Sequence, residues 1–249
     1  MSPAVAHVAN VVNVGPGLAL ERGPLPGLSP TWLIAAALLS LLPFLLLMLT
    51  SFVKLTVVLS ILKSAIGGGQ VPPSSIVTGL SAILTLFIMA PTGQRMYQAL
   101  ADETPAGPNG VPGLLARLDS LGGALAAADR VKEPVRAFLL ANAGPRERGS
   151  FLALAREMRP PADRAAMSDR DFLVLAPAFV VSELRRAFEI GFMLFLPFLV
   201  VDLVVANLLV GLGMTSLSPA LVALPFKLLL FVLVDGWHLV ARGLVQSYL

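Results

Sequence analysis

Four apolar runs dominate the pattern of hydrophobic and polar positions along this chain. Each is at least as long as the roughly 20 residues that a helix needs to cross the hydrocarbon core of a bilayer. The runs cover Leu33–Leu62, Ile76–Met96, Ile190–Leu212 and Ala220–Leu244. The pattern therefore predicts an all-α fold, that of a polytopic helical membrane protein.

Glycine and proline residues predict where the first two runs begin and end. Pro43 lies near the middle of run one, which predicts either a long tilted helix or two helical pieces that meet there. Run one should end at Gly67–Gly69, and Pro72–Pro73 favours the start of the next helix. Run two should stop near Pro91. Together the two runs predict an antiparallel hairpin.

Most charged residues lie between the two pairs of runs, in residues 92–186, where helical patterns cover Gly113–Ala127, Glu133–Ala141 and Ser150–Met158. The predicted organisation has a loosely ordered lead-in (1–30), a first hydrophobic hairpin (31–96), a charged helical extracytoplasmic insert (97–175) and a second hydrophobic hairpin with a C-terminal tail (176–249). The sparse charge of the tight turns favours both turns in the cytoplasm, with the insert and both termini outside.

Composition supports this class and excludes several functions. Hydrophobic residues make up 56% of the chain and charged residues 13%, against about 25% charged in soluble domains.

The absence of cysteine excludes disulfides and thiolate metal sites, and only His7 and His238 supply imidazole. The net charge of +3 arises in the insert, so no nucleic-acid binding is expected. The first 20 residues contain no lysine or arginine, so no signal peptide is expected.

Four ionisable residues interrupt the apolar runs: Lys54, Asp202, Lys227 and Asp235. A charge at membrane depth costs roughly 2.5–3.5 kcal/mol, so each needs a partner, water or a protein interior. Lys227 and Asp235 would lie about 12 Å apart along a helix and about 80° apart around it, so they cannot pair with each other. Lys54, Asp202 or Glu183 would have to reach them from another helix or another copy.

A charged stretch precedes run three. In PAFVVSELRRAFEIGF (177–192), Glu183 and Arg186 are at helical spacing, and Arg185 precedes Glu189 by four residues. Local ion pairs are therefore available. On spacing alone, the stretch is typical of an amphipathic segment whose charges lie at the water boundary.

Several long motifs stand in a fixed order along the chain. The early segment LLPFLLLMLTSFVKLTVVLSILKSAIGGGQVPP leads to FIMAP, and later PAFVVSELRRAFEIGF is followed by LPFLVVDLVVANLL and then ALPFKLLLFVLVDGW. These motifs closely resemble the FliP/SctR family, the core membrane subunit of type III secretion export apparatuses. The resemblance covers Leu33–Met96 and Ala176–Tyr248. It implies a non-enzymatic inner-membrane protein without a cofactor. About five copies would assemble with a related single-copy subunit and a small two-helix subunit into an export gate for unfolded proteins.

In such an assembly, helices that look transmembrane are packed against neighbouring subunits, and buried charges pair across interfaces. The resemblance therefore implies intersubunit charge contacts by Glu183, Lys227, Asp202, Asp235 and Lys54, with Glu183 and Lys227 as the favoured pair. The alternative is that each of these side chains snorkels or meets water within its own protomer.

Many relatives carry a methionine cluster after the glycine of the last hairpin, where flexible thioethers seal the pore. Here only Met214 is retained, and Thr215 and Ser216 follow it. Met214 with Leu217 is therefore the candidate gasket, unless the partner subunits supply the seal. Ordinary packing of Met214 is an equally simple interpretation.

Two further alternatives concern the type of protein. The segment SFVK (51–54) and the absence of a signal peptide favour the injectisome branch of the family, whereas the ending QSYL resembles flagellar members. A small secondary transporter would also bury charges at broken helices, for which Pro43, Pro197 and Pro225 are candidates. Inverted repeats are not visible, however, and no intramembrane enzyme motif is present.

Overall fold

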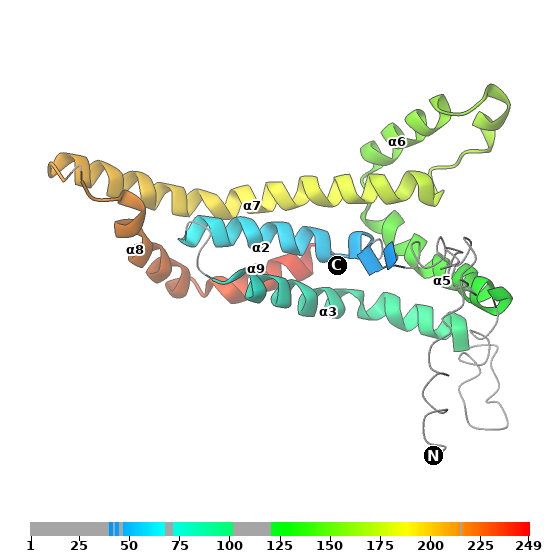
Figure 1. Ribbon diagram of the computed structural model, residues 1–249, viewed down its shortest axis with the longest axis horizontal. Helices are drawn as coiled ribbons and strands as arrows, with labels where there is room; N and C mark the ends of the chain where they lie inside the picture. The colour runs from blue at the N-terminus through cyan, green and yellow to red at the C-terminus, as the bar shows by residue number, and fades with distance from the viewer. Residues whose placement is uncertain (1–39, 42, 45–46, 68–71, 102–120, 215) are drawn as a thin grey trace, which may run out of the picture. The chain divides into compact units, whose positions relative to one another are not determined.

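The described residues fold into α-helices (Figure 1). The computed structural model describes residues 40–41, 43–44, 47–67, 72–101, 121–214 and 216–249, with the backbone alone for 101 and 121–128. The helices are α2 (Phe52–Gly67), α3 (Ser74–Ala101), α5 (Leu121–Asn142), α6 (Pro145–Glu157), the 3-10 helix η1 (Pro161–Ala166), α7 (Phe172–Gly211), α8 (Pro219–Leu233) and α9 (Gly236–Gln246). No strand occurs in the described residues, and the predicted all-α class is confirmed.

Residues Phe44–Leu249 form one packing unit, to which the description below applies. In the separate unit Met1–Pro43, residues 40–41 and 43 are helical. The predicted lead-in (1–30) and the signal-peptide prediction lie outside the described residues.

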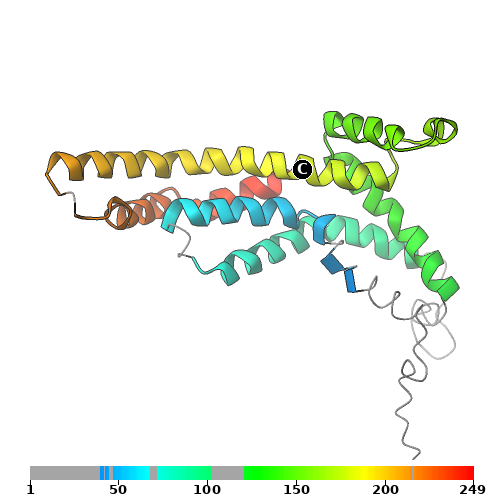
Figure 2. The ribbon, with the colours of Figure 1, turned by 45° about the horizontal axis from the view of Figure 1, so that its top comes forward.

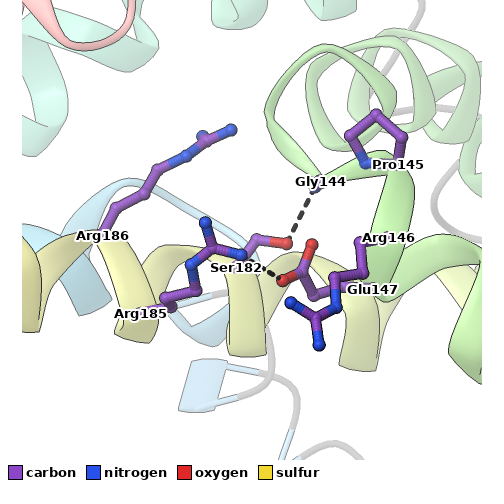
Figure 3. Close-up of a pocket in the computed structure, with 7 residues that line it drawn as sticks. All are labelled: Gly144, Pro145, Arg146, Glu147, Ser182, Arg185 and Arg186. Atoms are coloured by element: carbon purple, nitrogen blue, oxygen red, sulfur yellow. Dashed lines mark hydrogen bonds and ion pairs between the residues drawn. The ribbon is translucent and has the colours of Figure 1, made fainter.

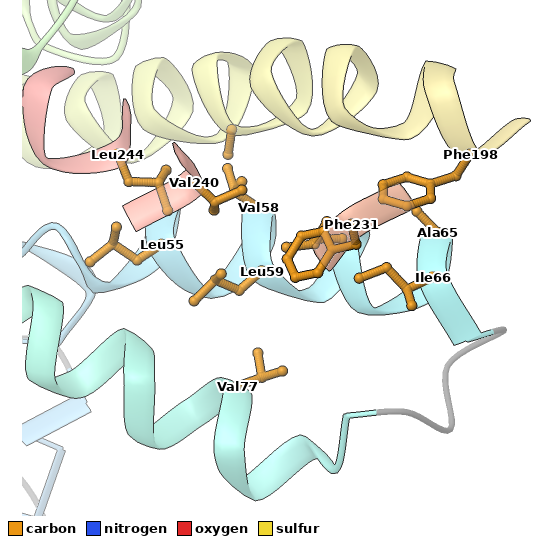
Figure 4. Packing of buried hydrophobic residues seen from close by; sticks show 12 residues of the cluster. Leu55, Val58, Leu59, Ala65, Ile66, Val77, Phe198, Phe231, Val240 and Leu244 are labelled. Atoms are coloured by element: carbon orange, nitrogen blue, oxygen red, sulfur yellow. The ribbon is translucent and has the colours of Figure 1, made fainter. Parts of the chain in front are cut away.

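Helix α2 is the enclosed helix at the centre of this unit, in contact with α3, α7 and α8. Figure 4 shows Val58 and Leu59 of α2 among Val77 of α3, Phe231 of α8 and Leu244 of α9. A helix that is apolar around most of its circumference is stable only when it is buried. The second half of the first apolar run therefore lies in a protein interior.

The turns at both ends of α2 follow local rules. Before α2, the Thr50 hydroxyl accepts a hydrogen bond from the Phe52 N–H at 3.3 Å and donates one to the Leu47 carbonyl. The helix ends at Gly67, and α3 begins at Ser74, directly after the two prolines. The predicted glycine stop and the predicted helix start are confirmed.

Helix α3 continues through Pro91 to Ala101, so the prediction that run two stops near Pro91 is wrong. Proline has no N–H, and an interior proline costs a helix about 3 kcal/mol. The second half of α3 packs against α5, where Pro91, Phe138 and Tyr248 help to line a cavity of about 480 Å³. This tertiary packing offsets the local cost.

A single helix of 40 residues, α7, joins two segments that the sequence separates. Run three is its second half, and the charged stretch before that run is part of the same helix, which continues through Pro177 and Pro197. Helix α2 lies alongside α7 in both views (Figures 1 and 2). By length and composition, α3 and α7 can each cross a membrane.

The last apolar run is two helices rather than one. Asp235, between α8 and α9, has left-handed backbone angles (φ 50°, ψ 52°), and the two helices meet at 61°. Gly236 lies against the Phe231 ring, where any side chain would overlap it. The predicted span Ala220–Leu244 is therefore at most one bent span.

The described part of the charged insert is helical, as predicted. Helix α5 contains the predicted pattern Glu133–Ala141, and α6 covers the predicted pattern Ser150–Met158 up to Glu157; both helices contact the first half of α7. The predicted pattern Gly113–Ala127 lies partly outside the described residues. A small second core, made of Leu139, Ala143, Leu175, Ala178 and Phe179, joins α5 to α7. The insert is thereby attached to the helix that carries the charged motif.

Candidate functional site

A fully buried ion pair lies at the centre of the first charge cluster. Lys54 Nζ of α2 is 3.2 Å from Glu183 Oε2 of α7, and both side chains have 0% of their surface exposed. Arg186 Nη1 lies 3.1 Å from the other oxygen of the same carboxylate, and the Tyr248 hydroxyl donates a hydrogen bond to Oε2. The Glu183 carboxylate therefore contacts two cations and accepts a hydrogen bond from a phenol.

The Lys54 ammonium has a second neighbour of a different kind. Its Nζ lies 3.4 Å from the centroid of the Tyr248 ring, in a cation–π contact. Such contacts are worth about 2 kcal/mol or more when the cation is desolvated. Arg186, which is 39% exposed, also donates to the backbone carbonyl of Asn142 at 2.9 Å. The cluster thus involves α2, α5, α7 and the residues after α9.

A polar pocket of about 450 Å³ lies between the start of α6 and α7 (Figure 3). Ser182, beside Glu183, accepts a hydrogen bond from the Gly144 N–H at 2.8 Å. Arg185 contacts Glu147 of α6 at 3.0 Å and Glu189 of α7 at 2.9 Å. The local ion pairs predicted from spacing, Arg185–Glu189 and Glu183–Arg186, are present. The Arg185–Glu147 pair, which spacing does not predict, joins α6 to α7.

Electrostatics in this pocket favour the ionised form of Glu147. A hydrogen bond from its own backbone N–H holds the pKa of Glu147 below its usual value, and the Arg185 guanidinium acts in the same direction while partial desolvation opposes both. The pocket has no free carboxylate and no nucleophile beside a base. It ties α6 to α7 and does not resemble a catalytic site.

The second charge cluster lies at Lys227 of α8. Its Nζ is 2.7 Å from Asp202 Oδ2 of α7 and donates a hydrogen bond to the Ala65 carbonyl at 2.9 Å. Ala65 is in the last turn of α2, where carbonyl groups lack helical partners and a cation is favourable. Lys227 therefore caps α2, and Asp202 compensates its charge. Lys54, Asp202 and Glu183 were left open as partners for the charges of the last apolar run. Of these three residues, Asp202 contacts Lys227 within the chain.

The two aspartates of the predicted set differ in their surroundings. Asp202 is 35% exposed, and its Oδ1 atom is buried without a donor in the part of the chain that the structure describes. Asp235 is exposed at the junction of α8 and α9. Both remain accessible from outside the protomer, in contrast to Lys54 and Glu183.

The gasket candidates follow the end of α7. Gly213 has φ +72°; its N–H bonds to the Val210 carbonyl, and the Met214 N–H bonds to the Leu209 carbonyl. This pair of bonds is a Schellman motif, in which glycine supplies the left-handed residue. Met214 and Leu217 are 47% and 45% exposed. The turn thus presents both apolar side chains at the tip of the α7–α8 hairpin.

Sequence reasoning did not identify Tyr248, Ser182 and Asn142 as parts of these clusters. Tyr248 is 65 positions from Glu183, so helical spacing carries no signal for this contact. The predicted intersubunit role of the five charged residues stays a prediction, because the contacts described here are within one chain. Among the described residues, no group of three or more His, Cys, Asp and Glu could hold a metal ion.

Comparison with known proteins shows which family this chain resembles over most of its length. The FliP family model matches residues 35–244. The hypersensitivity response secretion protein HrcR of Ralstonia nicotianae is 41% identical over 87% of this chain and 95% of its own length. The Yop proteins translocation protein R of Yersinia pestis is 41% identical over 87% and 94%. The flagellar biosynthetic protein FliP of Caulobacter vibrioides is 42% identical over 99% and 85%.

The family match extends over the charged motif, the α7–α8 turn and both charge clusters except Tyr248. Identity does not separate the two branches, since secretion and flagellar relatives are equally close. The chain therefore belongs to the FliP/SctR family and is a non-enzymatic, inner-membrane component of a type III secretion export apparatus.

Proposed function

We propose that this chain is a pore-forming gate subunit, present in about five copies around a channel for unfolded proteins. The copies would assemble with a related single-copy subunit and a small two-helix subunit. Family membership implies assembly into the export apparatus. One observation carries the finer proposal: the exposed face of α7 and α8 is apolar, yet it contains the Lys227–Asp202 ion pair, whose Asp202 side chain is 35% exposed.

The apolar face is long. On the second half of α7, the exposed large side chains are Phe192, Met193, Leu196, Leu199, Val200, Leu203, Val204, Leu208 and Val210. Lipid could cover these side chains, but it offers no hydrogen-bonding group to the Asp202 side chain, which is 35% exposed. A neighbouring subunit could supply both an apolar surface and a polar group. The combination therefore favours a protein partner over lipid along this part of α7.

The tip of the α7–α8 hairpin is the proposed seal. Met214 and Leu217 project from a turn whose backbone is fixed by Gly213. Methionine is unbranched and adapts to irregular contacts, which suits a gasket that must close and open around a passing chain. About five such tips would form an apolar ring, to which the partner subunits would add.

The charged residues divide into two groups in this proposal. Asp202 and Asp235 can meet another copy without leaving the positions described above, because both are accessible. A pair between Glu183 of one copy and Lys227 of another requires both to exchange partners, since they contact Lys54 and Asp202 within the chain. We therefore expect Asp202 and Asp235 to make the first intersubunit contacts.

Within the family, we favour an injectisome role over a flagellar one. The support is the SFVK segment. A test is complementation of two deletion strains, one lacking the injectisome member and one lacking the flagellar member. Recovery of effector secretion without motility supports the proposal, and recovery of motility alone contradicts it.

The decisive experiment is the native mass of the protein in mild detergent, measured alone and with the small two-helix subunit. A defined homo-oligomer that gains mass with that subunit is expected, and Asp202→Asn should weaken it. A stable monomer or dimer under both conditions would contradict the proposal and favour a small transporter.

Cysteine cross-linking tests the gate separately, because the chain has no native cysteine. Met214→Cys is expected to form disulfide-linked dimers between copies in the assembled complex. Leu154→Cys on α6, at a residue that is 52% exposed, is the matched control and should remain unlinked. An intact oligomer in which neither Met214→Cys nor Leu217→Cys forms cross-links would place the seal elsewhere.

A further inference from the structure

Tyr248 contacts three separate helices from a position just beyond the end of α9. Its hydroxyl donates to Glu183 of α7, and its ring lies under the Lys54 ammonium of α2. The same ring stacks with Phe138 of α5, with centroids 6.1 Å apart and an interplanar angle of 16°. One side chain therefore joins the first hairpin, the insert and the long helix.

The charges around Glu183 explain why this ring matters. The cluster contains two cations, Lys54 and Arg186, for a single carboxylate. Arg186 is partly exposed and has the Asn142 carbonyl as a further acceptor. Lys54 is fully buried and has no access to water, so its remaining stabilisation must come from the protein. The π-face of Tyr248 is the group that provides it.

The contacts of Tyr248 differ from ordinary core packing because they combine ionic and aromatic partners. The pair of oxygens on Glu183 is shared between Arg186 on one side and Lys54 with Tyr248 on the other. Phe138, which stacks on Tyr248, is also 5.6 Å from Phe179 of α7 by ring centroids. The aromatic contacts and the ionic contacts thus meet at the same residue.

We propose that Tyr248 is a clamp: a positioning residue that maintains the buried Lys54–Glu183 pair and fixes α5 of the insert against α2 and α7. The ring stabilises the ammonium, the hydroxyl orients the carboxylate, and the stack with Phe138 holds the insert. Without the clamp, the packing of α5 near Phe138 and of α2 near Lys54 loosens, although α7 and α8 keep their own contacts. This inference concerns the isolated chain and does not depend on the proposed gate.

The test is hydrogen–deuterium exchange of the full chain in detergent, comparing Tyr248→Leu, Tyr248→Phe and the unchanged protein. Tyr248→Leu removes the ring, so amides of α2 near Lys54 and of α5 near Phe138 should exchange roughly tenfold faster or more. Tyr248→Phe keeps the ring and should change α2 much less. Tyr97→Leu is the control, because Tyr97 is the other tyrosine of the chain and is 70% exposed.

Unchanged exchange in both α2 and α5 of Tyr248→Leu would overturn the clamp. So would an equal increase in α8, because that result indicates general loosening. If Tyr248→Leu does not fold, the same substitution is made together with Lys54→Met and Glu183→Gln, which remove the charges that the ring serves. Recovery of folding in this neutral background supports the clamp, and continued failure to fold overturns it.

Discussion

Gly191 of α7 lies against the side chain of Ile61 on α2. A Cβ atom at position 191 would overlap the end of the Ile61 side chain and approach its Cβ to 3.2 Å. The glycine is therefore required by the close approach of two helices rather than by a special backbone angle. Gly191 lies about two turns beyond Glu183, and Ile61 about two turns beyond Lys54, so this contact also helps to hold Lys54 opposite Glu183.

Gly191→Ala is expected to lower the free energy of unfolding in detergent by about 1–3 kcal/mol, because overpacking forces α2 and α7 apart. Gly79→Ala on α3 is the matched control, since nothing lies within 4 Å of a Cβ there. That change should raise the free energy of unfolding by about 0.5–1 kcal/mol through helix propensity alone. Thermal unfolding followed by circular dichroism measures both, and equal effects would contradict the close approach.

Glu183→Gln should be among the most damaging single changes at the charge clusters. It leaves the Lys54 ammonium buried without a counter-charge, which typically costs about 3–5 kcal/mol. Glu189→Gln removes a carboxylate from an exposed pair on the same helix and should have little effect. Chemical unfolding of the two variants makes the comparison. A mild effect of Glu183→Gln would mean that water reaches Lys54.

Lys227→Met tests the cap on α2. The variant loses the hydrogen bond to Ala65 and strands the Asp202 carboxylate, so we expect a loss of about 1–3 kcal/mol. Faster hydrogen exchange should be confined to the last turn of α2 and the facing part of α8. Lys132→Met, in an exposed pair with Asp129, is the control and should leave both regions unchanged.

Replacing Asp235 with glycine or with valine is expected to change the melting temperature in opposite directions. The left-handed backbone costs an ordinary residue about 1–2 kcal/mol, and glycine avoids this cost. Asp235→Gly should therefore raise the melting temperature of the isolated chain slightly, whereas Asp235→Val should lower it. Similar melting temperatures for the two variants would show that α8 and α9 do not keep the sharp bend at this residue.

The stability of the folded chain at alkaline pH is expected to depend on Tyr248. Burial raises the pKa of Tyr248, and the negative charge of Glu183 acts in the same direction. The raised pKa means that its stabilising contribution is complete below the unfolded value of about 10 and is lost as the pH rises above it. The slope is at most about 1.4 kcal/mol per pH unit for one group. Tyr248→Phe should lack this component of the alkaline loss, and Tyr97→Phe should retain it.

A second readout is the ultraviolet absorption of tyrosinate in the Tyr97→Phe background, where Tyr248 is the remaining tyrosine. The phenol should ionise only when the chain unfolds. Ionisation of the folded protein near pH 10 would contradict the burial of this hydroxyl.

The apolar runs predicted well where helices occur, because the length of an apolar run and the glycine or proline residues at its ends are local properties of the sequence. The stop at Gly67 and the start at Ser74 are examples. Two local rules failed for a physical reason. Pro91 remains inside α3 because packing against α5 outweighs one lost hydrogen bond, and the last run breaks at Asp235 because the chain turns beneath Phe231.

The charged residues could be recognised from the sequence, but their partners could not. Lys227 and Ala65 are 162 positions apart, and Tyr248 is 65 from Glu183. Spacing along one helix carries no information about such contacts. The cost of a buried charge predicted that Lys54 and Lys227 must be paired, and only the packing of α2 between its neighbours identifies the pairs.

The 40 residues of α7 correspond to a rod of about 60 Å, roughly twice the thickness of a hydrocarbon core. One end of this rod is fastened to the insert through Ser182 and Arg185, and the other end carries the tip with Met214. Because no turn interrupts the helix, a tilt imposed at the insert becomes a larger displacement at the tip. A load on α5 and α6 can therefore reach the α7–α8 turn without any change in secondary structure.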